Sequence, residues 1–193
     1  MKKIRTIVLA AFAALSMSAS AQEPFATFYL QYNPTQFHHK EIYGADTKDY
    51  FNQVAIGYNY ATPLFGIPLY LEFGGAFQYS FKSGDGYKVN MLAGKIPVNL
   101  LYSFDVSESV RIQPYAGTYG RFNFLAKTKP DEEEAINWFD SPQDGKRFQM
   151  GLQGGIKFVF SDVVIGGGYY YDLMNIMSDS HFEGFEITLG MQL

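Results

Sequence analysis

Residues 69–82 read LYLEFGGAFQYSFK, and this stretch decides the fold. Leucine, phenylalanine and tyrosine occupy nearly every odd position from Leu69 to Phe81, whereas most even positions hold polar or small residues such as Glu72. Alternation with a period of two predicts a β-strand with one apolar and one polar face. The 14 residues span about 46 Å at roughly 3.3 Å each, and a tilt of about 45° leaves about 33 Å, enough to cross a membrane hydrocarbon layer.

Similar alternation recurs along the rest of the chain, with turn-forming residues between the segments. The sequence predicts eight strands, at residues 25–33, 50–61, 68–82, 87–104, 110–125, 147–160, 163–174 and 183–193. An even number of antiparallel strands suits closure into an all-β, up-and-down transmembrane barrel. In the fourth strand the apolar residues Val89 and Met91 occupy odd positions, whereas Ile96 occupies an even position. Regular alternation would put them on opposite faces of the strand. We therefore expect a β-bulge near residues 93–94.

The N-terminal residues have the parts of a secretory signal peptide. A basic start, an apolar stretch at residues 6–14 and a small-x-small cleavage site at residues 19–21 predict a cleaved signal peptide at residues 1–21. Residues 22–193 are then the mature barrel domain. Three of the 15 basic residues lie in the signal peptide, so the mature domain carries 12 basic residues against 19 acidic ones. This acidic balance argues against a nucleic-acid partner, because phosphate binding needs clustered lysine and arginine.

The composition excludes several other classes of protein. The chain has no cysteine, which excludes a cysteine-linked lipid anchor, a disulfide-stapled fold and a cysteine-ligated metal site. The apolar part of the signal peptide is too short for a spanning helix of about 20 residues, and no later window is apolar enough, so we expect no transmembrane helix. The chain contains 18 phenylalanines, 15 tyrosines and 19 glycines, a mixture that favours sheet and tight turns.

The predicted connections differ in length between the two ends of the barrel. Residues 62–67, 105–109 and 161–162 form short connections at one end, whereas residues 34–49, 83–86, 126–146 and 175–182 form mostly longer ones at the other. Outer-membrane barrels keep short turns in the periplasm, so we expect both termini there. The acidic run at residues 131–134 lacks an EF-hand pattern, and we interpret it as a solvated loop rather than a cation site. The residues that follow it, 135–139, are expected to pack on the barrel rim, with contact to a ligand as the alternative.

The apolar face of each strand is too wide for a soluble barrel. The opposite face is narrow, rich in glycine and sparingly charged, as suits the crowded interior of an eight-stranded barrel, so we place the apolar face in lipid. On this parity seven charged side chains point inward: Glu72, Lys82, Arg111, Arg121, Lys157, Asp172 and Glu186. We expect Arg121, Asp172 and Glu186 toward the outer end. Glu72, Arg111 and Lys157 should lie toward the periplasmic end, so that buried charges pair at each level and plug the lumen.

Three stretches carry a family resemblance. IPVNLLY at residues 96–102, QPYAG at residues 113–117 and ITLGMQL at residues 187–193, together with the signal peptide, resemble the small outer-membrane β-barrel proteins of the porin family, of OmpA/OmpX-like type. The resemblance covers residues 22–193, although the chain ends in Leu193 where many members end in phenylalanine. It implies insertion into the outer-membrane lipid of a Gram-negative-type bacterium by the barrel-assembly machinery. It implies no single activity.

Three classes of function follow. The chain is expected to be a barrel of structural or surface-interaction type, with a small passive channel and a lipid-modifying enzyme as the alternatives. The long loops are the candidate site for an extracellular ligand, which no sequence pattern identifies. An acyl hydrolase needs a nucleophile beside a base, and no Gly-x-Ser-x-Gly elbow is present. Ser178, Asp179 and Ser180 do precede His181, but ordinary loop composition produces such a group easily. We therefore predict no catalytic residue, no cofactor and no enzyme activity.

The histidines pose a separate question. Barrel closure sets the last strand beside the first, which brings His38 and His39 toward His181, with Asp179 and Glu183 flanking. These side-chain types are accepted by Zn²⁺. Solvated loop histidines are the more common alternative, and consecutive histidines in a strand would point apart. The sequence therefore assigns no metal ligand and leaves a three-histidine site as an open hypothesis.

Overall fold

Ten β-strands make up most of the described chain. The computed structural model describes residues 23–40, 46–84, 86–131, 134–140, 144–177 and 179–193, and the predicted signal peptide lies outside them. The strands are β1 (Phe25–Lys40), β2 (Asp46–Leu64), β3 (Leu69–Gly84), β4 (Tyr87–Tyr102), β5 (Phe104–Ser107), β6 (Val110–Pro130), β7 (Ile136–Asn137), β8 (Phe148–Phe160), β9 (Val163–Asp172) and β10 (His181–Gln192). No helix among these residues is long and apolar enough to cross a membrane.

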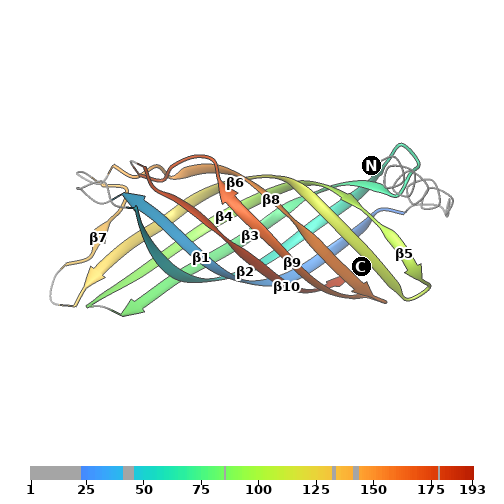
Figure 1. Ribbon diagram of the computed structural model, residues 1–193, viewed down its shortest axis with the longest axis horizontal. Coiled ribbons are helices and arrows are strands. Elements are labelled where there is room, and N and C mark those ends of the chain that lie inside the picture. The colour runs from blue at the N-terminus through green and yellow to red at the C-terminus, as the bar shows by residue number, and fades with distance from the viewer. Residues whose placement is uncertain (1–22, 41–45, 85, 132–133, 141–143, 178) are drawn as a thin grey trace, which may run out of the picture.

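Eight of the strands form the closed wall of a barrel (Figure 1). Each wall strand pairs antiparallel with its neighbours in sequence order, from β1 and β2 through β4, β6 and β8 to β9 and β10. The pairing of β1 with β10 closes the ring. β5 continues β4 beyond Ser103, and β7 adds two residues against β6. The expected eight-stranded up-and-down barrel is therefore confirmed.

The wall presents an apolar outer face and a largely polar inner face. On β10, Ile187 is 55% exposed whereas its neighbour Glu186 is 2% exposed. Every wall strand contributes exposed apolar side chains of this kind, among them Phe28, Val54, Phe77, Ile96, Phe122, Leu152, Ile165 and Ile187. A continuous apolar band of this extent is stable only against hydrocarbon. Apolar side chains therefore cover the outside of the barrel, and most polar side chains face its interior.

The two ends of the barrel differ in how the strands are joined. At the end on the right of Figure 1, β2 and β3 are joined by a tight turn in which Phe65 and Gly66 have φ of 56° and 64°. Positive φ at both central residues is typical of the two-residue hairpin turns whose twist matches that of the flanking strands. β8 and β9 are joined there by only two residues, 161–162. Ala26 and Leu193 exchange backbone hydrogen bonds of 3.1 and 2.8 Å at this end. Short turns and both ends of the barrel domain therefore lie together.

The predicted strand boundaries are least accurate at the opposite end. The first strand was expected to stop at Asn33. The next residue, Pro34, cannot donate a hydrogen bond to a ladder. β1 instead continues to Lys40, with Pro34 paired to β2 in unbroken register. Only the ladder to β10 lapses at Asn33 and Pro34, and it resumes at Thr35 in the same register. At the same end β2 begins at Asp46, β6 reaches Pro130, β8 begins at Phe148, β9 ends at Asp172 and β10 begins at His181.

The expected β-bulge lies in a different strand. Val89 and Met91, the residues that suggested it, are buried inside the barrel, and β4 keeps a single alternation along its length. The register between β4 and β6 shifts between Leu92 and Ala93, and the extra residue is Phe124 of β6. The prediction of a bulge within β4 is therefore wrong. The prediction failed because Val89 and Met91 are apolar residues on the inner face of β4, where they pack in an apolar cluster described below.

Candidate functional site

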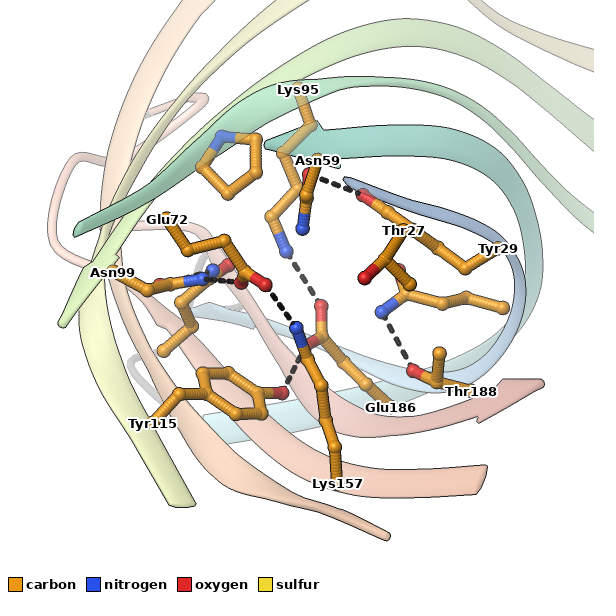
Figure 2. A pocket seen from close by; sticks show the side chains of 13 residues that line it. Thr27, Tyr29, Asn59, Glu72, Lys95, Asn99, Tyr115, Lys157, Glu186 and Thr188 are labelled. Atoms are coloured by element: carbon orange, nitrogen blue, oxygen red, sulfur yellow. Dashed lines mark hydrogen bonds and ion pairs between the residues drawn. The ribbon is translucent and has the colours of Figure 1, made fainter. Parts of the chain in front are cut away.

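Four charged side chains meet in the middle of the barrel interior (Figure 2). Lys157 of β8 donates a hydrogen bond to Glu72 of β3, and Lys95 Nζ of β4 lies 2.6 Å from Glu186 Oε1 of β10. All four side chains are buried. In the ring of eight strands β4 and β10 lie on opposite sides, so the second pair bridges the lumen. Buried charges of this kind are stable only when paired.

Polar neighbours satisfy most of the remaining oxygens of this network. Asn99 donates to Glu72 Oε1 at 2.9 Å, and Gln153 donates to Asn99 at 2.8 Å. The Tyr115 hydroxyl lies 3.5 Å from Glu186 Oε2. The space left between these side chains is a cavity of about 20 Å³, which is enough for a single water molecule. The interior is therefore filled at this level.

A third buried ion pair lies nearer the outer end, the end that carries the long connections. Arg121 of β6 donates to Asp172 of β9, and the Tyr119 hydroxyl donates to the same carboxylate. The backbone N–H of Phe182 adds a bond of 3.3 Å to Asp172. The Arg121 guanidinium also lies 5.1 Å from the centre of the Phe182 ring. This pair joins β6 to β9 just below an apolar layer.

That apolar layer closes the outer end of the lumen, and we call it the outer plug. Its buried members are Phe37, Phe51, Val89, Met91, Tyr119, Ala126, Trp138, Tyr170, Ile176 and Phe182. The Phe37 ring lies 4.7 Å from Phe182 and 5.6 Å from Trp138, measured between ring centres. The Trp138 indole N–H donates to Thr128 Oγ1 at 2.8 Å. The expectation that residues 135–139 pack on the rim is therefore confirmed for Trp138.

Most of the predicted lumen charges lie where they were expected. The interior holds five of the seven: Glu72, Arg121, Lys157, Asp172 and Glu186. Lys82 lies near the outer rim, 2.6 Å from Asp49, and Arg111 lies at the other end with a 3.4 Å bond to a backbone carbonyl. Glu186 was expected beside Arg121, but it belongs to the middle network instead. The position of Glu186 along the barrel axis was predicted wrongly, because neighbouring strands are staggered relative to one another.

Lys95 is a buried charged residue that the sequence analysis did not predict. Its neighbour Ile96 was correctly placed on the outer face, so strict alternation already put Lys95 inside. The outer plug was also missed. Phe37 and Phe51 lie in or beside a stretch that was predicted to be a loop, and the inner parity of a loop is not defined. Extending the strand alternation through Pro34 would have identified Phe37.

The structure brings together two of the three histidines, His38 and His181. His38 Nε2 lies 2.6 Å from Glu183 Oε1, and the His38 and His181 rings stack with their centres 4.9 Å apart and their planes 2° from parallel. The side chain of His39 lies outside the described part of the chain, as does Ser178. Asp179 is exposed, with a φ of 51°. Among the described residues, His38, His181 and Glu183 are the one group of three side chains of metal-ligand type whose ligand atoms lie close together.

Glu183 lies beyond Phe185, the last exposed apolar residue of β10 on this side, and hence outside the membrane-spanning part of the strand. Partial burial alone raises the pKa of its carboxyl. Hydrogen bonds with Tyr169 and His38 outweigh that effect, and they lower the pKa from its usual value together with the nearby imidazoles. The Tyr169 hydroxyl donates to Glu183 Oε2 at 2.5 Å. Both carboxylate oxygens therefore have partners.

The outer rim also carries exposed lysines. Lys88 of β4 pairs directly with Lys129 of β6, and Lys127 lies on the same outward face. Like charges opposite one another in a ladder are destabilising. Of the acidic run, Asp131 and Glu134 are exposed, whereas residues 132–133 lie outside the described part of the chain.

Comparison with known proteins gives a family and a set of structural relatives. The family model described as "Outer membrane protein beta-barrel domain" matches residues 7–192. The crystal structure of Ail, the attachment invasion locus protein of Yersinia pestis, is 14% identical, covers 89% of this chain and 100% of its own, and has a TM-score of 0.54. The outer membrane enzyme PagL is 10% identical, with 85% and 97% coverage and a TM-score of 0.52. Identities this low show the fold alone. No curated protein sequence matches.

Proposed function

Since the chain belongs to the outer membrane protein beta-barrel domain family, and is thus an integral outer-membrane protein, we propose that it is a non-conducting barrel of structural or surface-interaction type. The observation that carries this proposal is the filled interior. Two buried ion pairs in the middle and one nearer the outer end lie beneath the outer plug. An eight-stranded barrel is just wide enough for its side chains to fill. A protein without a pore acts through its surface.

The filled interior argues against the passive channel. Solute passage would require the Lys95–Glu186 bridge to break, because it spans the lumen between opposite walls. Separating a buried ion pair costs several kcal/mol. The outer plug would also have to open, because its aromatic rings pack against one another. Two independent barriers lie in series along the same path.

The arrangement of serine and histidine argues against the lipid-modifying enzyme. Ser180 is buried, whereas the His181 ring lies on the outer surface against His38. An acyl hydrolase requires the hydroxyl and the base to face one another within hydrogen-bond reach. The likeness to PagL concerns the fold and transfers no activity.

The outer rim supplies the surface for interaction in this proposal. β1 and β2 continue as a paired hairpin as far as Lys40 and Asp46, beyond the apolar band. The lysines at 88, 127 and 129 add an outward-facing positive patch. Such a patch favours a partner with anionic groups, because an anion relieves the repulsion between Lys88 and Lys129.

Paired assays on detergent-purified protein test the proposal. One assay measures hydrolysis of phospholipid and lipopolysaccharide acyl chains, and the other measures conductance after insertion into a planar bilayer. We expect no activity above the protein-free control in either assay. Steady single-channel currents would instead support the channel, and saturable release of fatty acid would support the enzyme.

A further inference from the structure

The outer end of the seam between β1 and β10 places three side chains of metal-ligand type on one outward patch. His38 of β1 pairs directly with His181 of β10. Glu183 lies two residues beyond His181 and so on the same face of β10. The residues next to the two histidines, Phe37 and Phe182, are buried inside the barrel. The patch is therefore built on two hydrogen-bonded strands, although the sequence placed these histidines in loops.

The ligand atoms already lie close to one another. One ring nitrogen of each histidine and one carboxylate oxygen of Glu183 lie within 4.8 Å of one another. A tetrahedral Zn²⁺ with bonds of about 2.1 Å holds its ligand atoms about 3.4 Å apart. Rotation of the imidazole rings covers this difference, because a ring moves about its side-chain bonds while the backbone ladder stays in place.

Neighbouring side chains orient the three groups. Tyr169 donates to the Glu183 oxygen that does not contact His38. The Tyr171 ring packs 4.9 Å from the His181 ring. The side chains of His38 and Glu183 are 20% and 18% exposed, so an ion can reach them from outside. Partners that hold ligands in this way commonly surround metal sites.

We propose that His38, His181 and Glu183 bind a divalent transition-metal ion of the Zn²⁺ type, which links the first and last strands of the barrel at its outer rim. Two imidazoles and one carboxylate suit such ions, whereas Ca²⁺ and Mg²⁺ prefer oxygen ligands alone. The ion takes the place of the hydrogen between His38 and Glu183. That hydrogen moves to Nδ1 of the neutral His38 imidazole, whose Nε2 lone pair then binds the ion. A fourth coordination position remains for water.

The position of the site suggests its effect on the barrel. The ladder between β1 and β10 lapses at Asn33 and Pro34, so its outer part is separated from the rest of the seam. An ion bound to both strands would hold that outer part closed. This inference does not depend on the filled interior, on which the proposed function rests, so either can fail without the other.

Calorimetric titration with ZnCl₂ tests the site. The folded, EDTA-treated protein in detergent is compared with His181→Ala, Glu183→Gln and a control, Glu134→Gln, which removes an exposed carboxylate outside the site. We expect saturable binding of one ion by the wild type and the control. Glu183→Gln replaces a charged ligand by a neutral amide and should bind at least about 10-fold more weakly, since the loss of a partner outside the ligand set alone has that effect. His181→Ala should show no saturable binding. CaCl₂ should give no saturable heat with any of them.

A second readout separates a bound ion from a simple ion pair. Zn²⁺ should raise the apparent melting temperature of the wild type and the control but not of His181→Ala, because an ion bound only by the folded state stabilises it. Emission of Trp138, the single tryptophan, checks that each variant is folded. If His181→Ala does not fold, Glu183→Gln, which keeps the shape of the side chain, provides the comparison. Absence of saturable binding to the wild type, or equal binding by wild type and Glu183→Gln, would contradict the proposal.

Discussion

The ammonium group of Lys95 has three interior partners. It lies 2.6 Å from Glu186 and within 4.5 and 5.3 Å of the ring centres of Tyr119 and Tyr170. Replacing Lys95 by methionine keeps most of the side-chain volume but leaves Glu186 buried without its cation. We expect Lys95→Met to lower the free energy of unfolding by about 3–5 kcal/mol, as loss of one partner of a buried pair does. Urea unfolding in detergent micelles, followed by Trp138 emission, measures this change.

Two further variants separate the charge from the packing. Lys127→Met removes an exposed lysine of the same type and should change the stability by no more than about 0.5 kcal/mol. The double variant Lys95→Met with Glu186→Gln should recover part of the loss, because it no longer buries an uncompensated charge. A Lys95→Met protein as stable as Lys127→Met would show that the interior pair contributes nothing.

The sequence predicts which side chains point into the barrel only where apolar and polar residues alternate regularly along the strand. Glu72, Lys157 and Asp172 were placed correctly, because each lies on a strand with an unbroken period of two. Their partners could not be read from the sequence, since pairing across a lumen depends on the stagger between strands. For this reason Glu186 was assigned to the wrong level.

The position of each wall strand in the sequence was predicted better than its length. The apolar stretch that lipid covers is the part of each strand with the clearest alternation, and the polar extension beyond it resembles a loop. β1 continues through Pro34, which is tolerated because only the ladder with β10 is interrupted there. The histidine patch was consequently expected on mobile loops, although it lies on paired strands.

The bulge in β6 gives a prediction about the wall itself. Phe124 is the extra residue between β6 and β4, and it is exposed next to exposed Leu125. Deleting Phe124 should restore regular pairing and keep every remaining side chain on its present face, so we expect the deletion variant to fold. Deleting Thr118 instead would turn Tyr119 and Arg121 toward lipid, because a shift of one residue exchanges the two faces of a strand.

The far-ultraviolet circular dichroism of the two refolded deletion variants tests this account of the bulge. The Phe124 deletion should retain the β-sheet signal of the wild type, and the Thr118 deletion should lose most of it. Equal loss in both variants would show that the bulge is required for folding rather than tolerated.

For the whole molecule, the asymmetry between the two ends predicts its orientation in the membrane. The connection that contains Asp144 and the end of β6 that carries Lys129 should face the cell exterior, and both termini should face the periplasm. Protease added to intact cells should therefore cleave only within those outer connections, while protease admitted to the periplasm gains access to residues 62–67. Cleavage of intact cells confined to residues 62–67 or 105–109 would reverse the orientation.

The central claim is that the lumen is closed to solutes, and cysteine labelling tests it most directly. The chain has no cysteine, so Thr188→Cys introduces one thiol of similar size beside the middle network, and Lys127→Cys introduces one on the exposed rim as a control. The purified folded proteins are treated with a charged maleimide, which reaches both ends of a detergent-solubilised barrel. We predict rapid labelling of Lys127→Cys, and labelling of Thr188→Cys only after unfolding in urea. Labelling of folded Thr188→Cys at the rate of the rim control would contradict a closed lumen.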